Sequence, residues 1–255
     1  MTLVEPYLSV VLPAYNEEQR LPKTLENVTA HLQTKDYAAE IIVVDDGSSD
    51  GTAEAVEGFA ASHPNVRLIR NEHRGKAYAV RSGVLASGGQ FVLFMDADGA
   101  TPIYELDKLL PHLEGEYDVA IASREGLGAR RHDEPAYRHY MGRVFNFIVQ
   151  VLAVPGIRDT QCGFKAFRRQ AARDLFSNLQ LYGADAGTVQ GAVVTAFDVE
   201  ILFLARKWGY TIAEVPVHWY YGTESKVSPI TDSWRNFRDV LRVRWNDLRR
   251  RYGRD

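Results

Sequence analysis

The sequence of 255 residues predicts an α/β fold, with an open, mostly parallel sheet flanked by helices and an amphipathic C-terminal helix. Short apolar runs rich in β-branched residues alternate with helical stretches along the first half of the chain. The runs lack polar alternation, which is typical of strands buried on both faces of a parallel sheet. Hydrophobic residues make up 45% and charged residues 25%, which excludes a disordered or fibrous chain.

The first half of the chain predicts four strands separated by three helices. The apolar runs that indicate strands are Leu8–Leu12, Ile41–Val44, Val66–Ile69 and Phe91–Met95. A helix is expected after the first strand, because Leu21, Leu25, Val28 and Leu32 share one helical face. Pro22 suits the first turn of that helix. The next two helices are expected at Thr52–Ala61 and Lys76–Ala86.

The second half is less regular. Strands are expected at Val119–Ser123, Gly163–Phe167 and Thr211–Val217. Helices are expected at Tyr137–Val154, Phe197–Trp208 and Ser233–Arg251. Two glycine-containing polar segments are expected to be loops, the first of them mobile, at Gly126–Glu134 and Asn178–Gly191.

The domain organisation follows from what the sequence lacks. No Pro/Gly/Ser linker divides it, so we expect one domain over residues 1–230, with residues 231–255 as a helix appended to it. The single cysteine, Cys162, excludes an internal disulfide and a thiolate metal cluster. The first residues are interpreted as leading into a strand and not as a signal peptide. No run approaches 18 apolar residues, so no transmembrane segment is expected, and the expected compartment is the cytoplasm.

Charge is concentrated in the C-terminal segment. The net charge is −3, and residues 231–255 hold eight arginines and four aspartates, a local +4 that leaves −7 for the rest. An apolar stripe runs along this helix through Trp234, Phe237, Leu241, Trp245 and Leu248. The stripe either packs against the domain or lies on an anionic membrane surface. Its aromatics are not interleaved for base stacking, so a nucleic-acid partner is not expected.

Polar residues follow three of the predicted strands. The first strand leads into Pro13–Glu17, the second into Asp45–Ser48 and the fourth into Asp96–Gly99. Ligands of open parallel sheets bind at these carboxyl ends. Any one segment could be an ordinary turn that caps a helix, but three acidic ends at one edge repel each other unless a cation or donor lies among them.

Two of these acids are spaced to share a metal ion. Asp96 and Asp98 follow a buried strand with one small residue between them. Carboxylate oxygens suit Mg²⁺ or Mn²⁺, which complete their shells with water and phosphate oxygens. A diphosphate is therefore the expected counter-ligand.

Competing nucleotide and hydrolase motifs are absent. A P-loop would need glycine where Arg70 stands, and a dinucleotide fingerprint starting at Gly126 would need glycine where Arg131 stands. No G-x-S-x-G turn is present either. Kinase, NTPase, dinucleotide dehydrogenase and serine hydrolase functions are therefore disfavoured.

The motifs together resemble a known family. Ser9–Glu17, Asp45–Thr52, Arg74–Lys76 and Asp96–Asp98 resemble the inverting family 2 glycosyltransferases, which have the Rossmann-like GT-A fold and use nucleotide-diphosphate sugars. A second set of motifs resembles the polyprenyl-phosphate branch of that family, which includes the dolichyl-phosphate β-glucosyltransferases. This set is Asp96–Pro102, Asp159–Phe167, Phe197–Leu202, Trp208–Val217 and Ser225–Val227. The resemblance spans residues 8–227.

The resemblance implies transfer of glucose from UDP-glucose to a polyprenyl phosphate at a membrane surface, with Mg²⁺ or Mn²⁺. Transfer to a soluble or another lipid acceptor, and nucleotide-sugar binding without turnover, remain alternatives. Oligomeric state cannot be read from the sequence. In the mannosyl-transferring relatives a glutamine often stands two residues after the second metal aspartate, and here that residue is Ala100, which favours the glucosyl branch.

The resemblance also implies roles for individual residues. Those implied around the base and ribose are Pro13, Tyr15 and Glu17, with Asp45 accepting from the nucleobase. Ala14 and Lys76 are also implied at the nucleotide sugar. Those implied at the ribose and metal–diphosphate are Asp96, Ala97 and Asp98, of which Asp96 and Asp98 bind the metal and Asp98 is also catalytic. Those implied at the acceptor phosphate are Ser123, Arg124 and Arg138.

Two further catalytic candidates come from the second half of the chain. Asp198 is expected to orient a donor hydroxyl or a neighbouring arginine, because a phosphate acceptor is already ionised and needs no general base. The plainer interpretation is a helix-capping Asp198 followed by a solvent-exposed Glu200. Lys226 is expected to neutralise charge on the leaving diphosphate.

Overall fold

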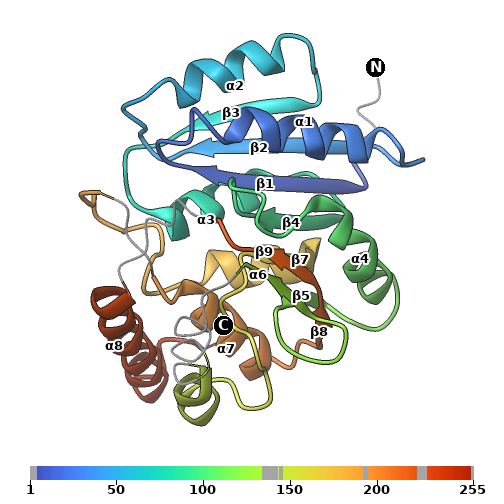
Figure 1. Cartoon of the computed structure of the whole chain (residues 1–255). Coiled ribbons are helices and arrows are strands. Elements are labelled where there is room, and N and C mark those ends of the chain that lie inside the picture. The colour runs from blue at the N-terminus through green and yellow to red at the C-terminus, as the bar shows by residue number, and fades with distance from the viewer. Residues whose placement is uncertain (1–4, 134–142, 144–145, 192–194, 223–228, 254–255) are drawn as a thin grey trace.

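We analysed a computed structural model that describes residues 5–133, 143, 146–191, 195–222 and 229–253, with the side chains of 229–233 left undescribed (Figure 1). Arg138 and Lys226 lie outside the described residues, as does much of the helix expected at Tyr137–Val154. Of that predicted helix, residues 146–152 are described and are helical.

A seven-stranded sheet forms the centre of the molecule, in the order β3-β2-β1-β4-β7-β5-β8. Its strands are β1 Leu8–Ala14, β2 Ala39–Asp45, β3 Val66–Arg70, β4 Phe91–Met95, β5 Val119–Ser123, β7 Phe164–Arg168 and β8 Ile212–Pro216. Only β7 among these runs antiparallel to its neighbours, β4 and β5. The strands β1, β2, β4 and β5 therefore all end at the same edge.

Helices cover both faces of this sheet (Figure 1). One apolar core includes residues of α3 Lys76–Ala86, α6 Arg169–Ser177 and α7 Phe197–Lys207. The opposite core includes residues of α1 Leu21–Leu32, α2 Thr52–Ala60, the 3₁₀ turn η1 Ile103–Glu105 and α4 Leu106–Glu114. Helix α3 lies very close to the sheet, because a Cβ at Gly83 would stand 2.4 Å from a methyl carbon of Val11.

The structure confirms the predicted fold class and the seven predicted strands. It also contains elements that we did not predict, namely α4, α6 and a small two-stranded sheet of β6 Arg130–His132 and β9 His218–Tyr220. The expectation of an irregular loop over Gly126–Glu134 is therefore wrong in part, because β6 pairs in parallel with β9. That pairing joins residues almost ninety positions apart, which a local pattern does not reveal.

The C-terminal helix α8, Pro229–Leu248, packs through a different face from the one that its apolar stripe suggests. Its buried residues are Asn236, Asp239, Val240, Val243 and Asn246. Trp234, Leu241, Trp245 and Leu248 are instead 69%, 45%, 55% and 73% exposed. The interpretation that the stripe packs against the domain is therefore wrong for these four residues.

The helices that the structure describes include none with both the length and the apolar character needed to cross a bilayer.

Candidate active site

The ends of β1, β2 and β3 are joined by hydrogen bonds. The backbone N–H of Asp46 donates to the carbonyl of Ala14 (2.9 Å), and Asn71 N–H donates to the carbonyl of Asp45 (2.8 Å). The Asp45 side chain is buried and accepts the backbone N–H of Ser48 at 3.1 Å. Asp45 thus lies at the sheet edge expected for a bound base.

Asp46, which we did not single out from the sequence, organises the turn before α3. Its buried carboxylate accepts the N–H groups of Arg74 (3.0 Å) and Gly75 (2.7 Å) and contacts His73 Nδ1 (2.8 Å). Gly75 has φ 92°, a conformation that favours glycine. The His73 ring stacks on Tyr15 with 3.9 Å between centroids. These contacts fix the start of α3, where Lys76 lies.

Lys76, the first residue of α3, joins this helix to the acidic end of β4. Its Nζ lies 2.5 Å from Asp96 Oδ1. Burial alone would lower the pKa of Lys76, but the charges of Asp96, Asp198 and Asp98 outweigh it and raise that pKa. Lys76 is therefore a fixed positive charge beside the two metal candidates.

Asp98 is exposed at the rim of the sheet and accepts the N–H of Ala100 at 3.0 Å. Desolvation and then the negative charge of Asp96 raise the pKa of its carboxyl. Two carboxylates in this arrangement would be relieved by a cation between them. Among the described residues no cluster of three or more His, Cys, Asp or Glu side chains could hold a metal. The pair fits Mg²⁺ or Mn²⁺ that takes its remaining ligands from phosphate and water.

Gly163, the residue before β7, lies against Asp96. Asp96 N–H donates to the carbonyl of Gly163 at 3.0 Å. A Cβ placed on Gly163 would lie only 2.2–2.5 Å from the Asp96 carboxyl group. Glycine at 163 is therefore required for this position of the Asp96 side chain.

A buried ion pair joins the same strand, β7, to helix α7. Lys165 is fully buried, and its Nζ lies 2.5 Å from Asp198 Oδ1 and 2.5 Å from the carbonyl oxygen of Cys162. Within the described part of the chain, Asp198 therefore pairs with a lysine, where the sequence suggested a donor hydroxyl or an arginine. We did not single out Lys165, although one charged residue inside the apolar run from Phe164 to Phe167 was an available signal.

Glu200, two residues further on α7, is also fully buried. The interpretation of Glu200 as a solvent-exposed acid is therefore wrong. Its carboxylate accepts the hydroxyl of Tyr252 (2.7 Å) and the N–H groups of Gln180 (2.8 Å) and Leu181 (3.1 Å). The capping interpretation of Asp198 is also wrong, because α7 has Ala196 as its N-cap residue.

Arg124, at the end of β5, is held by Asp159 in a bidentate ion pair. Its Nε and Nη2 lie 2.7 Å and 2.9 Å from the two oxygens of Asp159. Its guanidinium also lies over the ring of Trp219, 5.3 Å from the centroid. Burial alone would raise the pKa of Asp159, but the charge and hydrogen bonds of Arg124 outweigh burial and lower it. Asp159 therefore stays ionised and binds one edge of the Arg124 guanidinium.

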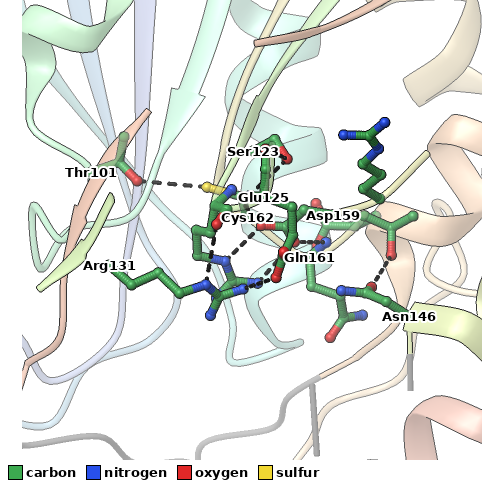
Figure 2. Close-up of polar contacts among 12 residues, drawn as sticks. Thr101, Ser123, Glu125, Arg131, Asn146, Asp159, Gln161 and Cys162 are labelled. Carbon is green, nitrogen blue, oxygen red and sulfur yellow. Dashed lines mark hydrogen bonds and ion pairs between the residues drawn. The ribbon is translucent and has the colours of Figure 1, made fainter. Parts of the chain in front are cut away.

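Figure 2 shows the polar network around this pair. Ser123 is buried, and its hydroxyl donates to Glu214 (2.8 Å) and accepts from the N–H of Glu125 (3.2 Å). Glu214 also accepts the N–H of Asp159 at 2.8 Å. The end of β5 and the segment around Asp159 are therefore locked together.

The remaining candidates lie at or after the ends of β1 and β4. Pro13 and Ala14 are its last two residues and are buried, whereas Tyr15 is half-buried. Glu17 forms a bidentate ion pair with Arg20, with both distances 2.7 Å. Ala97 is buried beside Asp96. The structure thus brings the donor candidates of β1, β2, α3 and β4 to one edge, with Ser123 and Arg124 at the end of β5.

The chain thus has a fold of the GT-A type, with acids and Lys76 at the carboxyl ends of its parallel strands. Residues 9–176 match the family described as "Glycosyl transferase family 2", and the chain belongs to that family.

Curated relatives cover most of the chain. A dolichyl-phosphate β-glucosyltransferase of Dictyostelium discoideum is 38% identical over 95% of this chain and 75% of its own length. The proteins of the same description from Drosophila melanogaster and Homo sapiens are 39% and 35% identical, over 92% and 93% of this chain and 74% of each relative.

Solved structures share the fold at lower identity. Glucosyl-3-phosphoglycerate synthase of Mycobacterium tuberculosis, in complex with Mn²⁺, UDP and phosphoglyceric acid, has a TM-score of 0.66 at 18% identity and covers 98% of this chain and 80% of its own. A mannosyltransferase of Pyrobaculum calidifontis, in complex with GDP-Man and Mn²⁺, has a TM-score of 0.61 at 22% identity, covering 97% and 65%. These likenesses confirm the fold.

Proposed function

We propose that this chain transfers glucose from UDP-glucose to dolichyl phosphate or another polyprenyl phosphate, with inversion at the anomeric carbon. The observation that carries the proposal is the 35–39% identity to dolichyl-phosphate β-glucosyltransferases over more than nine tenths of the chain. The acidic edge of the sheet supports it, because a donor diphosphate needs cations and this edge holds Lys76 and two carboxylates suited to a metal.

In this reaction an oxygen of the acceptor phosphate attacks the anomeric carbon. The bond from that carbon to the diphosphate breaks, and UDP leaves. The acceptor oxygen is already ionised near neutral pH, so no side chain has to remove a proton. This suits Asp198, whose carboxylate pairs with Lys165 and would orient a hydroxyl of the donor sugar instead of removing a proton.

On the donor side, Asp45 would accept from the base and Lys76 would pair with the diphosphate. Asp96 and Asp98 would hold Mg²⁺ or Mn²⁺, which supplies positive charge to the leaving diphosphate when bound. Arg124 would contact the acceptor phosphate through its guanidinium, whose planar fork matches two phosphate oxygens. Arg138 and Lys226 stay predictions for the acceptor phosphate and the leaving group. Acceptors of this kind lie in a bilayer, so we also propose that the chain works at a membrane surface.

The test is a screen of UDP- and GDP-sugars against a short polyprenyl phosphate, with and without Mn²⁺. We expect UDP-glucose with metal to give the fastest transfer. Faster transfer from a GDP-sugar would refute the donor assignment. Equal transfer to a soluble sugar acceptor would refute the acceptor assignment, and binding without transfer would refute the enzymatic function.

A further inference from the structure

The outward face of α8 combines large apolar side chains with arginines. Trp234, Leu241, Trp245 and Leu248 recur at intervals of seven, four and three residues and are 45–73% exposed. Surface positions of a globular protein rarely hold two tryptophans and two leucines along one helix face. This face is therefore an interaction surface.

The charges of α8 are sorted between its two sides. The side chains of Arg238, Arg242, Arg244 and Arg249 are exposed. The acids of the described part point toward the domain instead. Asp239 is fully buried and accepts the hydroxyl of Tyr182 at 2.6 Å, and Asp247 pairs with Lys207 of α7 at 2.5 Å. The outward side thus carries mainly positive charge, which complements an anionic partner.

A second helical segment also exposes large apolar side chains. Phe147 and Val151, in the helical residues 146–152, are 67% and 64% exposed. We name the six exposed side chains on the two helices the docking face, which consists of Phe147, Val151, Trp234, Leu241, Trp245 and Leu248.

Both helices are attached to the segment that holds Arg124. The Thr160 hydroxyl donates to the Asn146 side-chain oxygen (3.4 Å), and the Asn236 amide donates to the Gln161 side-chain oxygen (3.5 Å). Thr160 and Gln161 immediately follow Asp159, whose carboxylate forms the ion pair with Arg124. Figure 2 shows Asn146 and Gln161 beside Asp159. In Figure 1, α8 lies on the side of the molecule toward which β1 and β2 run.

We propose that the docking face rests on the surface of an anionic bilayer and thereby places Arg124 at the level of the lipid phosphates. The inference rests on the proposed function, which requires a phosphate that stays in the membrane. Aromatic and leucine side chains flanked by arginines are the composition of helices that lie in the bilayer interface. Both helices are attached next to Asp159, through Thr160 and Gln161. Docking would therefore be coupled to acceptor binding, because Asp159, which pairs with Arg124, belongs to the same short segment.

The test measures binding of the full chain to phosphatidylcholine vesicles with and without phosphatidylserine. We expect binding to the anionic vesicles that weakens with salt. Trp234→Ser/Trp245→Ser should weaken binding about tenfold or more by removing buried apolar area. Arg238→Glu/Arg249→Glu should weaken it by a similar factor and remove the preference for phosphatidylserine.

Matched control variants carry the same kinds of change on other exposed surfaces, namely Tyr117→Ser and Lys23→Glu/Arg173→Glu. These controls should bind vesicles as the unmodified chain does. Equal loss of binding in the controls, or no binding by the unmodified chain at low salt, would overturn the proposal. Circular dichroism establishes that each variant is folded.

A second readout separates this proposal from the proposed function. Transfer to a short polyprenyl phosphate is measured in detergent and in vesicles. The docking-face variants should keep their rate in detergent and lose at least about tenfold in vesicles, in proportion to their lost binding.

Vesicle binding without transfer in either medium would refute the proposed function but not the docking face. Transfer in detergent by a chain that binds no vesicle would refute docking alone. A dimer that Trp234→Ser/Trp245→Ser converts to a monomer, together with no vesicle binding, would assign the face to a second copy and also overturn the proposal.

Discussion

Replacing Lys165 by methionine tests whether the buried ion pair with Asp198 supports both the fold and the site. Methionine has a similar volume but cannot neutralise Asp198. In Lys165→Met the Asp198 carboxylate, only 5% exposed, would lose its partner, and the carbonyl of Cys162 would lose a donor. Because an unpaired buried charge is strongly unfavourable, we expect the free energy of unfolding to fall by about 3–5 kcal/mol.

That loss is a large part of the roughly 5–15 kcal/mol that stabilises a typical domain. For a chain of this size it corresponds to a fall in melting temperature of roughly 6–20 °C. The double variant Lys165→Met/Asp198→Val removes both charges and replaces them with apolar groups. We expect it to recover most of the lost stability, since replacing a whole buried pair is often close to neutral.

Equilibrium unfolding in urea gives the free energies of the four proteins of this double-mutant cycle. Glucose transfer and UDP binding are measured on the same samples. The double variant should be stable and bind UDP, yet transfer glucose slowly, because Asp198 is absent. A loss below about 1 kcal/mol in Lys165→Met, or a double variant less stable than Lys165→Met, would refute the reasoning about the pair. Full transfer by the stable double variant would refute the role of Asp198.

Four further predictions concern the edge of the sheet. Asp98→Ala should abolish transfer and leave the melting temperature nearly unchanged, because the side chain is exposed; full activity, or activity insensitive to EDTA, would contradict its metal role. Arg124→Ala should weaken use of the polyprenyl phosphate about ten- to a hundred-fold while UDP binding is kept, as expected for the loss of a charge-assisted hydrogen bond; an equal loss of UDP affinity would place Arg124 at the donor. Asp159→Asn should be less stable than the unmodified chain at pH 7. The lowered pKa of Asp159 stabilises the fold above the ordinary aspartate value near 4, so this difference, measured by urea unfolding, should shrink as the pH falls below about 4. A constant difference down to pH 2 would contradict the low pKa. Gly163→Ala should reduce transfer by displacing Asp96, whereas Gly58→Ala, where nothing lies within 4 Å of the new Cβ, serves as the matched control.

The sequence was most informative about the site where acidic residues directly follow a predicted strand. Asp45, Asp96 and Asp98 could be placed at one edge because parallel strands share their direction, and the structure puts them there. The strand Phe91–Met95 was predicted with its observed bounds, because five consecutive apolar residues preceding an acid leave few alternatives.

Pairing between distant residues was beyond local patterns. Lys165 and Asp198 are 33 positions apart, and Arg124 and Asp159 are 35 apart, so each pair depends on how β7 and β5 are arranged in the sheet. The apolar run could place Arg124 directly after a strand, but it could not show which acid would form an ion pair with it.

Periodicity also gave a stripe on α8 without giving its direction. The usual rule turns the apolar face inward, but here polar residues are buried as well and form hydrogen bonds with the domain. Asp239 accepts the hydroxyl of Tyr182, and Asn236 donates to Gln161. Such buried polar contacts depend on tertiary partners, and no local pattern identifies them.

The antiparallel strand β7 has a consequence for synthesis of the chain. Strands β1 to β4 are complete by residue 95, but the free side of β4 is covered only when residues 164–168 arrive, because β7 lies between β4 and β5. For about seventy residues of translation, β4 therefore presents an unpaired apolar edge, the kind of edge that recruits other chains. We expect nascent chains released just before residue 164 to aggregate or to bind chaperones more than chains that extend past residue 168. Equal solubility of the two would show that another segment protects β4 in the meantime.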